Sequence, residues 1–238
     1  MRKTLLFLSI FVFCLPAFAQ EKQEHKVTAD LTAQGIVGYN TTWKWYSGGD
    51  IKGVLHLKNT DIHLDLESLT SNVHSVGATV SPYFDVCKNG QIFLDGTLHS
   101  RIFSRDKAYE FVYSGSAGFR MRHFSVQAGV FAKIMDALGR NWHSVDNYIA
   151  EPFNVLYRIA VSIKGFDNPW DIYFIGADYS EFEYERVWQP IFTLGGRAKV
   201  GERLSIVAEG TLKPAGMFHL DANFYAAWLK VGVNYKLQ

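Results

Sequence analysis

The sequence predicts an all-β protein, an antiparallel up-and-down β-barrel of about twelve strands. Apolar and polar residues alternate with a period of two along most of the chain, as they do when side chains point in turn to the two faces of a sheet. Several alternating runs, such as residues 109–121, are much longer than the ~5–6 residues of a typical globular strand. One face of these runs carries almost no charge, and the other face is rich in it.

The N-terminus has the pattern of a secretory signal peptide. Two basic residues precede an apolar run at residues 5–15, and Ala17 and Ala19 supply the small residues of a cleavage site. We therefore expect a signal peptide at residues 1–19 and a single domain at residues 20–238. The apolar run is shorter than the ~20 residues of a transmembrane helix, and no later run approaches that length.

Charge and cysteine content exclude several classes of function. Lys and Arg number 24 against 23 Asp and Glu, so no basic excess would attract nucleic acid or anionic lipid. Cys87 is the only cysteine after the expected signal peptide, which rules out an intrachain disulfide and a cysteine-rich zinc site. We expect no nucleic-acid partner.

Six strands are expected in the N-terminal half. Asn89 and Gly90 lie between two alternating runs, and Asn-Gly is the strongest hairpin signal because both residues accept positive φ. Residues 41–50 are interpreted as a loop after the first strand, and a short turn follows the second at Asn59. The expected strands are residues 29–39, 51–58, 62–67, 76–84, 92–98 and 109–121.

Six more strands are expected in the C-terminal half. The apolar residues change from odd to even positions at residues 120–123, which requires a tight turn. Longer loops are expected at residues 136–152 and 181–189. In the last strand the apolar phase slips at Trp228 and Leu229, which indicates a bulge or a further turn. The expected strands are residues 124–134, 155–163, 173–179, 192–200, 204–212 and 218–237.

Loop lengths and aromatic residues favour a transmembrane barrel over a secreted soluble one. Connections after even-numbered strands are short and those after odd-numbered strands tend to be longer, as in barrels with turns on one side of a membrane and loops on the other. Aromatic residues lie near strand ends, where girdles form at membrane interfaces. They are Tyr39, Tyr113, Tyr157, Trp170, Tyr179, Phe192 and Trp228.

These features together resemble the outer-membrane β-barrel proteins of Gram-negative bacteria. The resemblance spans residues 20–238 and includes the closing run Gly-Val-Asn-Tyr-Lys-Leu at residues 232–237. It implies a location in the cell outer membrane, with the lipid bilayer and the outer-membrane insertion machinery as partners. The chain departs from the class at its end, because Gln238 stands where such barrels usually have an aromatic residue.

The charged face of the strands is expected to line the lumen. It could form a path for small solutes, or its side chains could pair with one another and fill the lumen. Twelve strands lie between the ~8 of packed barrels and the ~16–18 of open channels, so strand number does not separate these interpretations. The nearly balanced signs predict no preference for anions or cations. The candidate lumen-lining residues are Lys52, His56, His63, Asp65, Glu67, Asp95, His99, Arg101, Glu110, Arg120, Arg158, Arg197, Glu209 and Asp221.

Three adjacent His-Ser pairs, at residues 74–75, 99–100 and 143–144, raise the possibility of hydrolysis. Neighbours in a strand point to opposite faces and cannot form a catalytic pair. Only His143 and Ser144, in an expected loop, have free geometry, and a solvated loop is the favoured interpretation. We therefore expect no catalytic site.

His56 and His63 could approach each other and bind a metal with Asp65 or Glu67, but a hydrogen-bonded network in the lumen is favoured because zinc sites show tighter ligand spacing. No metal and no cofactor are expected. A separate group of aromatic residues in the outer loops is expected to anchor at the membrane interface rather than to stack on sugars or partners. This group is Trp43, Trp45, Tyr46, Trp142 and Tyr148.

The favoured function is a narrow passive channel for small solutes. The alternative is a non-conducting structural or adhesive barrel that displays its outer loops. A lipid-modifying outer-membrane enzyme is a third, disfavoured hypothesis.

Overall fold

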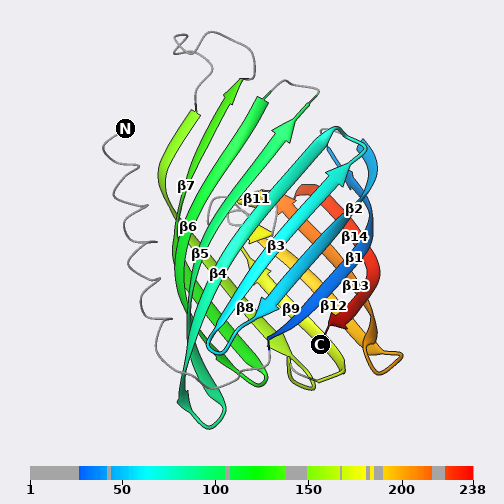
Figure 1. Cartoon of the computed structure of the whole chain (residues 1–238). Coiled ribbons are helices and arrows are strands. Elements are labelled where there is room, and N and C mark those ends of the chain that lie inside the picture. Colours follow the sequence, from blue (N-terminus) through cyan, green and yellow to red (C-terminus); the bar gives the residue numbers. More distant parts are fainter. Residues whose placement is uncertain are drawn as a thin grey trace.

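In the part of the chain that the structure describes, twelve strands close into one antiparallel barrel, which confirms the predicted fold class (Figure 1). The computed structural model describes residues 27–41, 44–104, 108–137, 149–166, 168–180, 183–184, 190–215 and 223–237. The barrel strands are β1 (Thr28–Asn40), β2 (Lys44–His56), β3 (Thr60–Leu69), β4 (Val73–Cys87), β5 (Gly90–Phe103), β6 (Ala108–Met121), β7 (Phe124–Ala137), β8 (Ile149–Ser162), β9 (Trp170–Ala177), β12 (Ile191–Lys199), β13 (Leu204–Ala215) and β14 (Asn223–Leu237). Between β9 and β12 lies a two-stranded ribbon, β10 (Tyr179–Ser180) and β11 (Glu183–Tyr184).

The first and last strands close the wall. β1 and β14 pair antiparallel from Ala29 and Leu237 at one end to Asn40 and Ala226 at the other. Closure removes the free strand edges, which in hydrocarbon would leave backbone N–H and C=O groups without partners. The start of β1 and the end of β14 therefore share one rim, the lower one in Figure 1.

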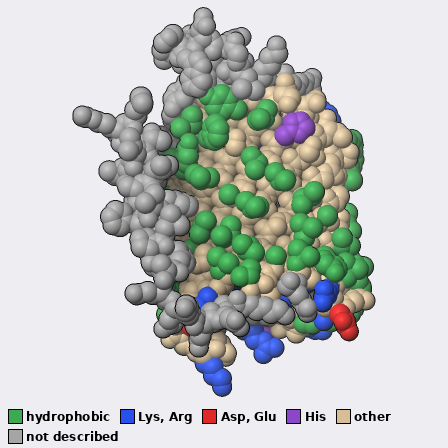
Figure 2. Space-filling model, in the orientation of Figure 1, with side chains coloured by type: hydrophobic (Ala, Val, Ile, Leu, Met, Phe, Trp, Pro, Cys, Tyr) green, Lys and Arg blue, Asp and Glu red, His purple; other side chains and the backbone are tan. Residues whose placement is uncertain are grey.

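The outer wall is apolar. Every barrel strand projects at least one large, exposed apolar side chain, with Leu64, Val155 and Leu194 among the most exposed. Figure 2 shows hydrophobic side chains spread over one face of the wall and charged side chains gathered at its lower rim. Such a band, with charge confined to its border, is a membrane-spanning surface.

Within the described residues, no helix is both long enough and apolar enough to cross a membrane.

β2 is longer than predicted. Residues 44–50, expected in a loop, form its first half and pair with β1 as far as Asn40 and Lys44. The loop prediction is wrong because Gly48 and Gly49 interrupt the alternation that marks a strand. A long β1 nevertheless needs a partner strand of equal length, since its backbone groups must be paired within the membrane.

The phase slip at Trp228 and Leu229 is neither a turn nor a bulge. β14 continues unbroken through both residues. Trp228 packs inside the barrel whereas Leu229 is exposed outside, so an apolar residue on the inner face produces the slip. The register shift lies between Lys213 and Pro214 of β13, where proline has no N–H for the ladder. Residues 218–222 of the predicted strand lie outside the described residues.

The Asn-Gly turn occurs in the predicted place with a different geometry. Cys87 pairs with Gly90, so Lys88 and Asn89 form the turn. Neither Asn89 nor Gly90 has positive φ. A register shift between Asp85 and Cys87 adjusts the strand instead.

The ribbon β10–β11 begins inside the barrel. Tyr179 packs against Val112, Phe131 and Leu156, which face inward from β6, β7 and β8, and these four residues are called the ribbon cluster. The Tyr179 hydroxyl donates a hydrogen bond to Gln127 Oε1 at 3.1 Å. The predictions that Tyr179 and Trp228 belong to membrane girdles are therefore wrong, because both side chains lie within the lumen.

Candidate functional site

The interior of the barrel is packed over much of its height. Each of the twelve barrel strands contributes at least one inward side chain that is less than a tenth exposed. One such residue from each strand, in chain order, gives Gln34, Asp50, Leu69, Ser75, Arg101, Glu110, Phe131, Leu156, Ala177, Ile191, Thr211 and Lys230. A water-filled pore at this level would leave the charged members of this set hydrated, so the lumen resembles a protein core here.

A buried lysine organises the charges on one side of the lumen. Lys230 Nζ donates to Asp50 Oδ2 at 2.8 Å and to Glu67 Oε2 at 3.1 Å. The side chains of Lys230, Asp50 and Glu67 are 8%, 0% and 10% exposed. Lys52 Nζ adds a second cation at 3.7 Å from Asp50 Oδ2.

A second set of ion pairs continues around the wall on β5, β6 and β7. Glu110 accepts from Lys133 at 3.0 Å and lies 3.7 Å from Arg101. The Arg101 guanidinium also stands 5.6 Å from the centroid of the Phe103 ring. Arg101 interacts electrostatically with Glu67, which links the two sets. We call them together the central network.

An apolar cluster lies between the central network and the rim of the longer connections. Leu69 and Val73, which flank the turn at residues 70–72, pack there with Ile36, Phe103 and Trp228. These five residues are called the rim cluster. With the ribbon cluster, it places bulky apolar side chains in the half of the lumen that faces the longer connections.

The other half of the lumen contains cavities. A cavity of about 220 Å³ is lined by side chains of β3 to β8 and by Phe166 of the turn after β8. A second cavity of about 450 Å³ at the rim of the short turns shares Asp61, Tyr83, Arg120 and Phe166 with the first. We call the first the vestibule cavity. A polar space therefore leads from the short-turn rim inward and ends below the packed region.

Hydrogen bonds tie the vestibule cavity to the ribbon. Asp95 accepts from Ser81 Oγ at 2.6 Å and from Gln127 Nε2 at 2.7 Å. Gln127 in turn accepts from Tyr179. A continuous series of hydrogen-bonded side chains thus joins the wall of the cavity to β10.

The candidate residues predicted from the sequence divide into three groups. Lys52, Glu67, Arg101 and Glu110 belong to the central network. The vestibule cavity is lined by His63, Asp95, Arg120 and Arg158. The third group comprises the remaining described candidates, which are His56, Asp65, His99, Arg197 and Glu209. Asp221 lies outside the described residues.

Local contacts hold the members of the third group. His56 bonds Asp61 at 2.8 Å and Asp30 at 3.3 Å. Arg197 donates to two backbone carbonyls of the turn after β8.

On other strands, Glu209 accepts from the Tyr173 hydroxyl at 2.5 Å. His99 is buried on β5, and a Cβ at Gly77 would meet both His99 and Asp65.

Three central residues were not predicted. Asp50 fell in the segment interpreted as a loop, and Lys230 lies beside the phase slip at Trp228. Lys133 stands between Ala132 and Ile134 on an alternating strand, so its inward position could have been predicted from the sequence. The pairing of Lys230 with Asp50 was not, because 180 positions separate them in the chain.

Two further sets of residues singled out from the sequence are the candidate metal ligands and the aromatic residues of the outer loops. In the described ranges, no group of three or more His, Cys, Asp or Glu residues could hold a metal ion. Trp45 projects outward, 76% exposed, and its ring meets that of Tyr39 at 5.5 Å, as expected of an interface anchor. Tyr46 instead packs against the rim cluster inside the barrel. Trp43, Trp142 and Tyr148 lie outside the described residues.

The structure forms a Ser-His contact that the sequence did not suggest. Ser68 and His74 pair across β3 and β4, and Ser68 Oγ lies 3.0 Å from His74 Nδ1 on the exposed face. A depression beside the pair includes Gly35 and Gly49, which oppose each other without side chains. His143 and Ser144 lie outside the described residues.

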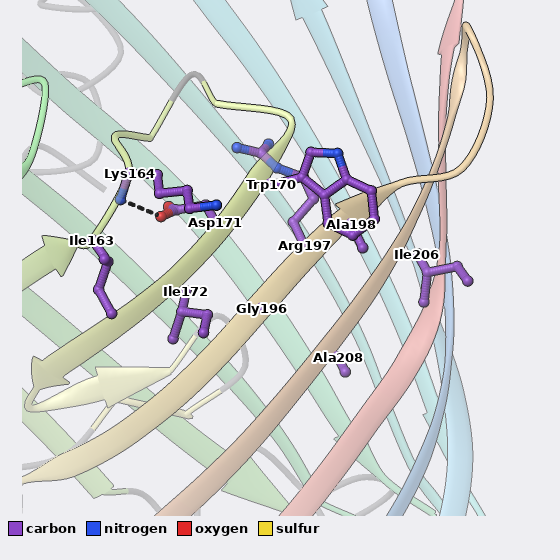
Figure 3. Close-up of a pocket in the computed structure, with 10 residues that line it drawn as sticks. All are labelled: Ile163, Lys164, Trp170, Asp171, Ile172, Gly196, Arg197, Ala198, Ile206 and Ala208. Atoms are coloured by element: carbon purple, nitrogen blue, oxygen red, sulfur yellow. Dashed lines mark hydrogen bonds between the residues drawn. The ribbon is translucent and has the colours of Figure 1, made fainter.

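A second depression in the outer wall lies over β9, β12 and β13 (Figure 3). Its floor is formed by small residues, Gly196, Ala198 and Ala208, and Trp170 and Ile206 stand at its edges. Its volume is about 390 Å³. It faces the lipid rather than the lumen, so it is no opening through the wall.

No family model and no curated protein matches the sequence. Solved structures match in fold. The translocator domain of the autotransporter NalP from Neisseria meningitidis is 11% identical, with a TM-score of 0.54 and coverage of 98% of this chain and 97% of that one.

Two porins are similar to the same degree. The NanC porin is 10% identical, with a TM-score of 0.52 and coverage of 86% and 100%. The KdgM porin, solved in complex with disordered oligogalacturonate, is 10% identical, with a TM-score of 0.50 and coverage of 87% and 98%. These likenesses show that the chain has the fold of an outer-membrane β-barrel.

Replacement of the central lysine is expected to destabilise the barrel strongly. Lys230→Met leaves Asp50 and Glu67 buried without their cation, and removal of one partner from a buried ion pair costs about 3–5 kcal/mol. Urea unfolding of the purified barrel in phospholipid vesicles measures the change. Lys164→Met, at an exposed site, is the control and should change the free energy of unfolding little; equal effects of the two substitutions would contradict a central role for Lys230.

Proposed function

We propose that the protein is a narrow outer-membrane channel for small solutes whose lumen is closed, in the state described, by its own side chains. The observation that carries the proposal is the arrangement along the lumen. A polar, hollow vestibule opens at the short-turn rim and ends at the central network and the two apolar clusters. The porin fold shared with NanC and KdgM supports the channel part of the proposal.

The buried charges of the packed region favour a channel that can open over a lumen that is permanently filled. Hydrophobic isosteres would fill a lumen at least as stably as buried ion pairs, because desolvation offsets much of the attraction between charges. A network of charges can also exchange its partners for water when the apolar clusters move, which a fully apolar plug cannot do. The lumen-facing candidate residues would then line the open path, with no net preference of sign.

Export and insertion belong to the same proposal. Residues 1–19 direct the chain across the inner membrane, and the outer-membrane insertion machinery then assembles the barrel. The alternating apolar and polar residues of β14 support recognition by that machinery. The adhesive alternative depends on outer loops that lie largely outside the described residues.

Truncation of the two apolar clusters is expected to open the channel. In planar bilayers, the natural protein should show little steady current at low voltage. The double variant Phe131→Ala/Trp228→Ala removes one large aromatic side chain from each of the ribbon and rim clusters, and its mean conductance should rise several-fold.

The control is Trp170→Ala/Phe174→Ala, which truncates equally large side chains on the outer wall and should leave conductance unchanged. If the natural protein already conducts like an open pore, the closed lumen is wrong. If neither protein passes current at any voltage, the channel itself is wrong and the non-conducting alternative remains.

A second candidate function rests on Ser68 and His74. A serine within hydrogen-bond reach of a histidine, on a lipid-facing wall, is the arrangement that acyl-ester hydrolysis requires. The pair lies near the rim of the longer connections, just inside the level of the Tyr39–Trp45 aromatic pair that marks the interface. Lipid ester groups occupy that depth.

Release of fatty acid from phospholipid vesicles tests this second function. If the purified protein shows activity, Ser68→Ala should lower it by about 100-fold or more, since the nucleophile is lost. Ser100→Ala removes a hydroxyl from the same outer face on β5 and should have no effect. Absence of activity in the natural protein, or an equal loss in both variants, would exclude the candidate.

A further inference from the structure

The vestibule cavity differs from the central network in how its charges are partnered. In the network, each carboxylate lies within 4 Å of a cation. The vestibule cavity contains two cations, Arg120 and Arg158, and two carboxylates, Asp61 and Asp95, that form no ion pair with one another. Opposite charges are therefore held apart across a hollow space.

Among the described residues, the two cations of the cavity have no anionic partner within ion-pair distance. Within the residues described, the Arg158 guanidinium makes neither a hydrogen bond nor an ion pair. Arg120 donates from Nη2 to Gln91 Oε1 at 2.8 Å, which is a neutral partner. An arginine fork in this situation is suited to bind a carboxylate with two parallel hydrogen bonds.

In the part of the chain that the structure describes, neither carboxylate of the cavity has a lysine or arginine within ion-pair distance. Asp95 accepts hydrogen bonds from Ser81 and Gln127, both neutral. Asp61 is bonded by His56 at 2.8 Å. Their oxygens can accept further hydrogen bonds, since an ionised carboxylate has about four acceptor sites. A solute with an ammonium group would supply the missing positive charge.

The cavity also has an apolar side. Phe93, Tyr83 and Phe166 line it beside the charged groups. The tip of the Phe93 ring lies against Gly118 of β6, where a Cβ would clash with it. The volume of about 220 Å³ is below the ~300–1,000 Å³ of sites for drug-sized ligands. The ligand is therefore small and partly apolar.

We infer that the vestibule cavity binds a small zwitterionic α-amino acid with an apolar side chain. The carboxylate of the ligand bonds the Arg158 guanidinium, its ammonium group bonds the carboxylate of Asp95 or Asp61, and its side chain contacts Phe93. The inference deepens the proposed channel, on which it rests, by naming the class of solute. A zwitterion neutralises both separated charges at once, whereas a simple anion or cation would neutralise one and face the other.

The test compares three ligands of matched shape by isothermal titration calorimetry of the full-length barrel in detergent micelles. L-leucine carries both charges, 4-methylpentanoate only the carboxylate, and 3-methylbutylamine only the ammonium group. Leucine should bind saturably, and each single-charge analogue should bind at least tenfold more weakly. Equal binding of either analogue, or no saturable binding of leucine, would overturn the inference.

Substitutions of cavity residues test whether leucine binds in the vestibule cavity. Arg158→Gln should weaken leucine binding at least tenfold, whereas Arg203→Gln, the same change at an exposed turn, should leave it unchanged. Gly118→Ala keeps every charge but displaces the Phe93 ring into the cavity, so it should weaken binding as well. If leucine binds equally to the natural protein and to both cavity variants, the site lies elsewhere and the inference fails. Because binding is measured without current, its failure is distinct from a failure of the channel proposal.

Discussion

The need to pair every backbone N–H and C=O group within the membrane is the constraint on which the rest of this structure depends. It is met by the closing pair of β1 and β14 and by strands long enough to match their neighbours across the bilayer. It also explains why β2 begins at Lys44, far earlier than its weak alternation indicates. Once the wall is closed, each residue faces either lipid or lumen.

A closed wall also encloses a lumen, and the side chains that face it determine whether it is open. In the described part of the chain, the twelve-stranded wall encloses two apolar clusters and a buried set of charges, and cavities lie toward the short turns. The ribbon β10–β11 contributes to this filling, because Tyr179 reaches the cluster of Val112, Phe131 and Leu156. Closure at one side and a charged vestibule at the other together suggest a channel with a resting, closed state.

Much of the wall could be predicted from the sequence, and much of the lumen could not. Period-two alternation located the strands and the apolar outer face, since that signal is local and repeats along each strand. Contacts between residues far apart in the chain leave no local signal, so the contact of Lys230 with Asp50 was not predicted. The inward position of Trp228 was not predicted because an apolar residue there breaks the alternation. The entry of Tyr179 into the lumen was missed for a different reason: its alternation continues that of β9 although the wall strand ends at Ala177. The contact of Ser68 with His74 depends on the register of β3 and β4, which the alternation leaves undetermined.

The most direct test of the closed lumen is its accessibility to a charged thiol reagent, measured at two positions in a Cys87→Ser background. Ser125 lines the vestibule cavity, and Ser75 is buried on β4 beyond the hollow region. With the folded barrel in vesicles, Ser125→Cys should react readily, and Ser75→Cys on the order of a hundredfold more slowly, because buried thiols are inert. Similar rates at the two positions would show water along the whole lumen and would contradict the closed state.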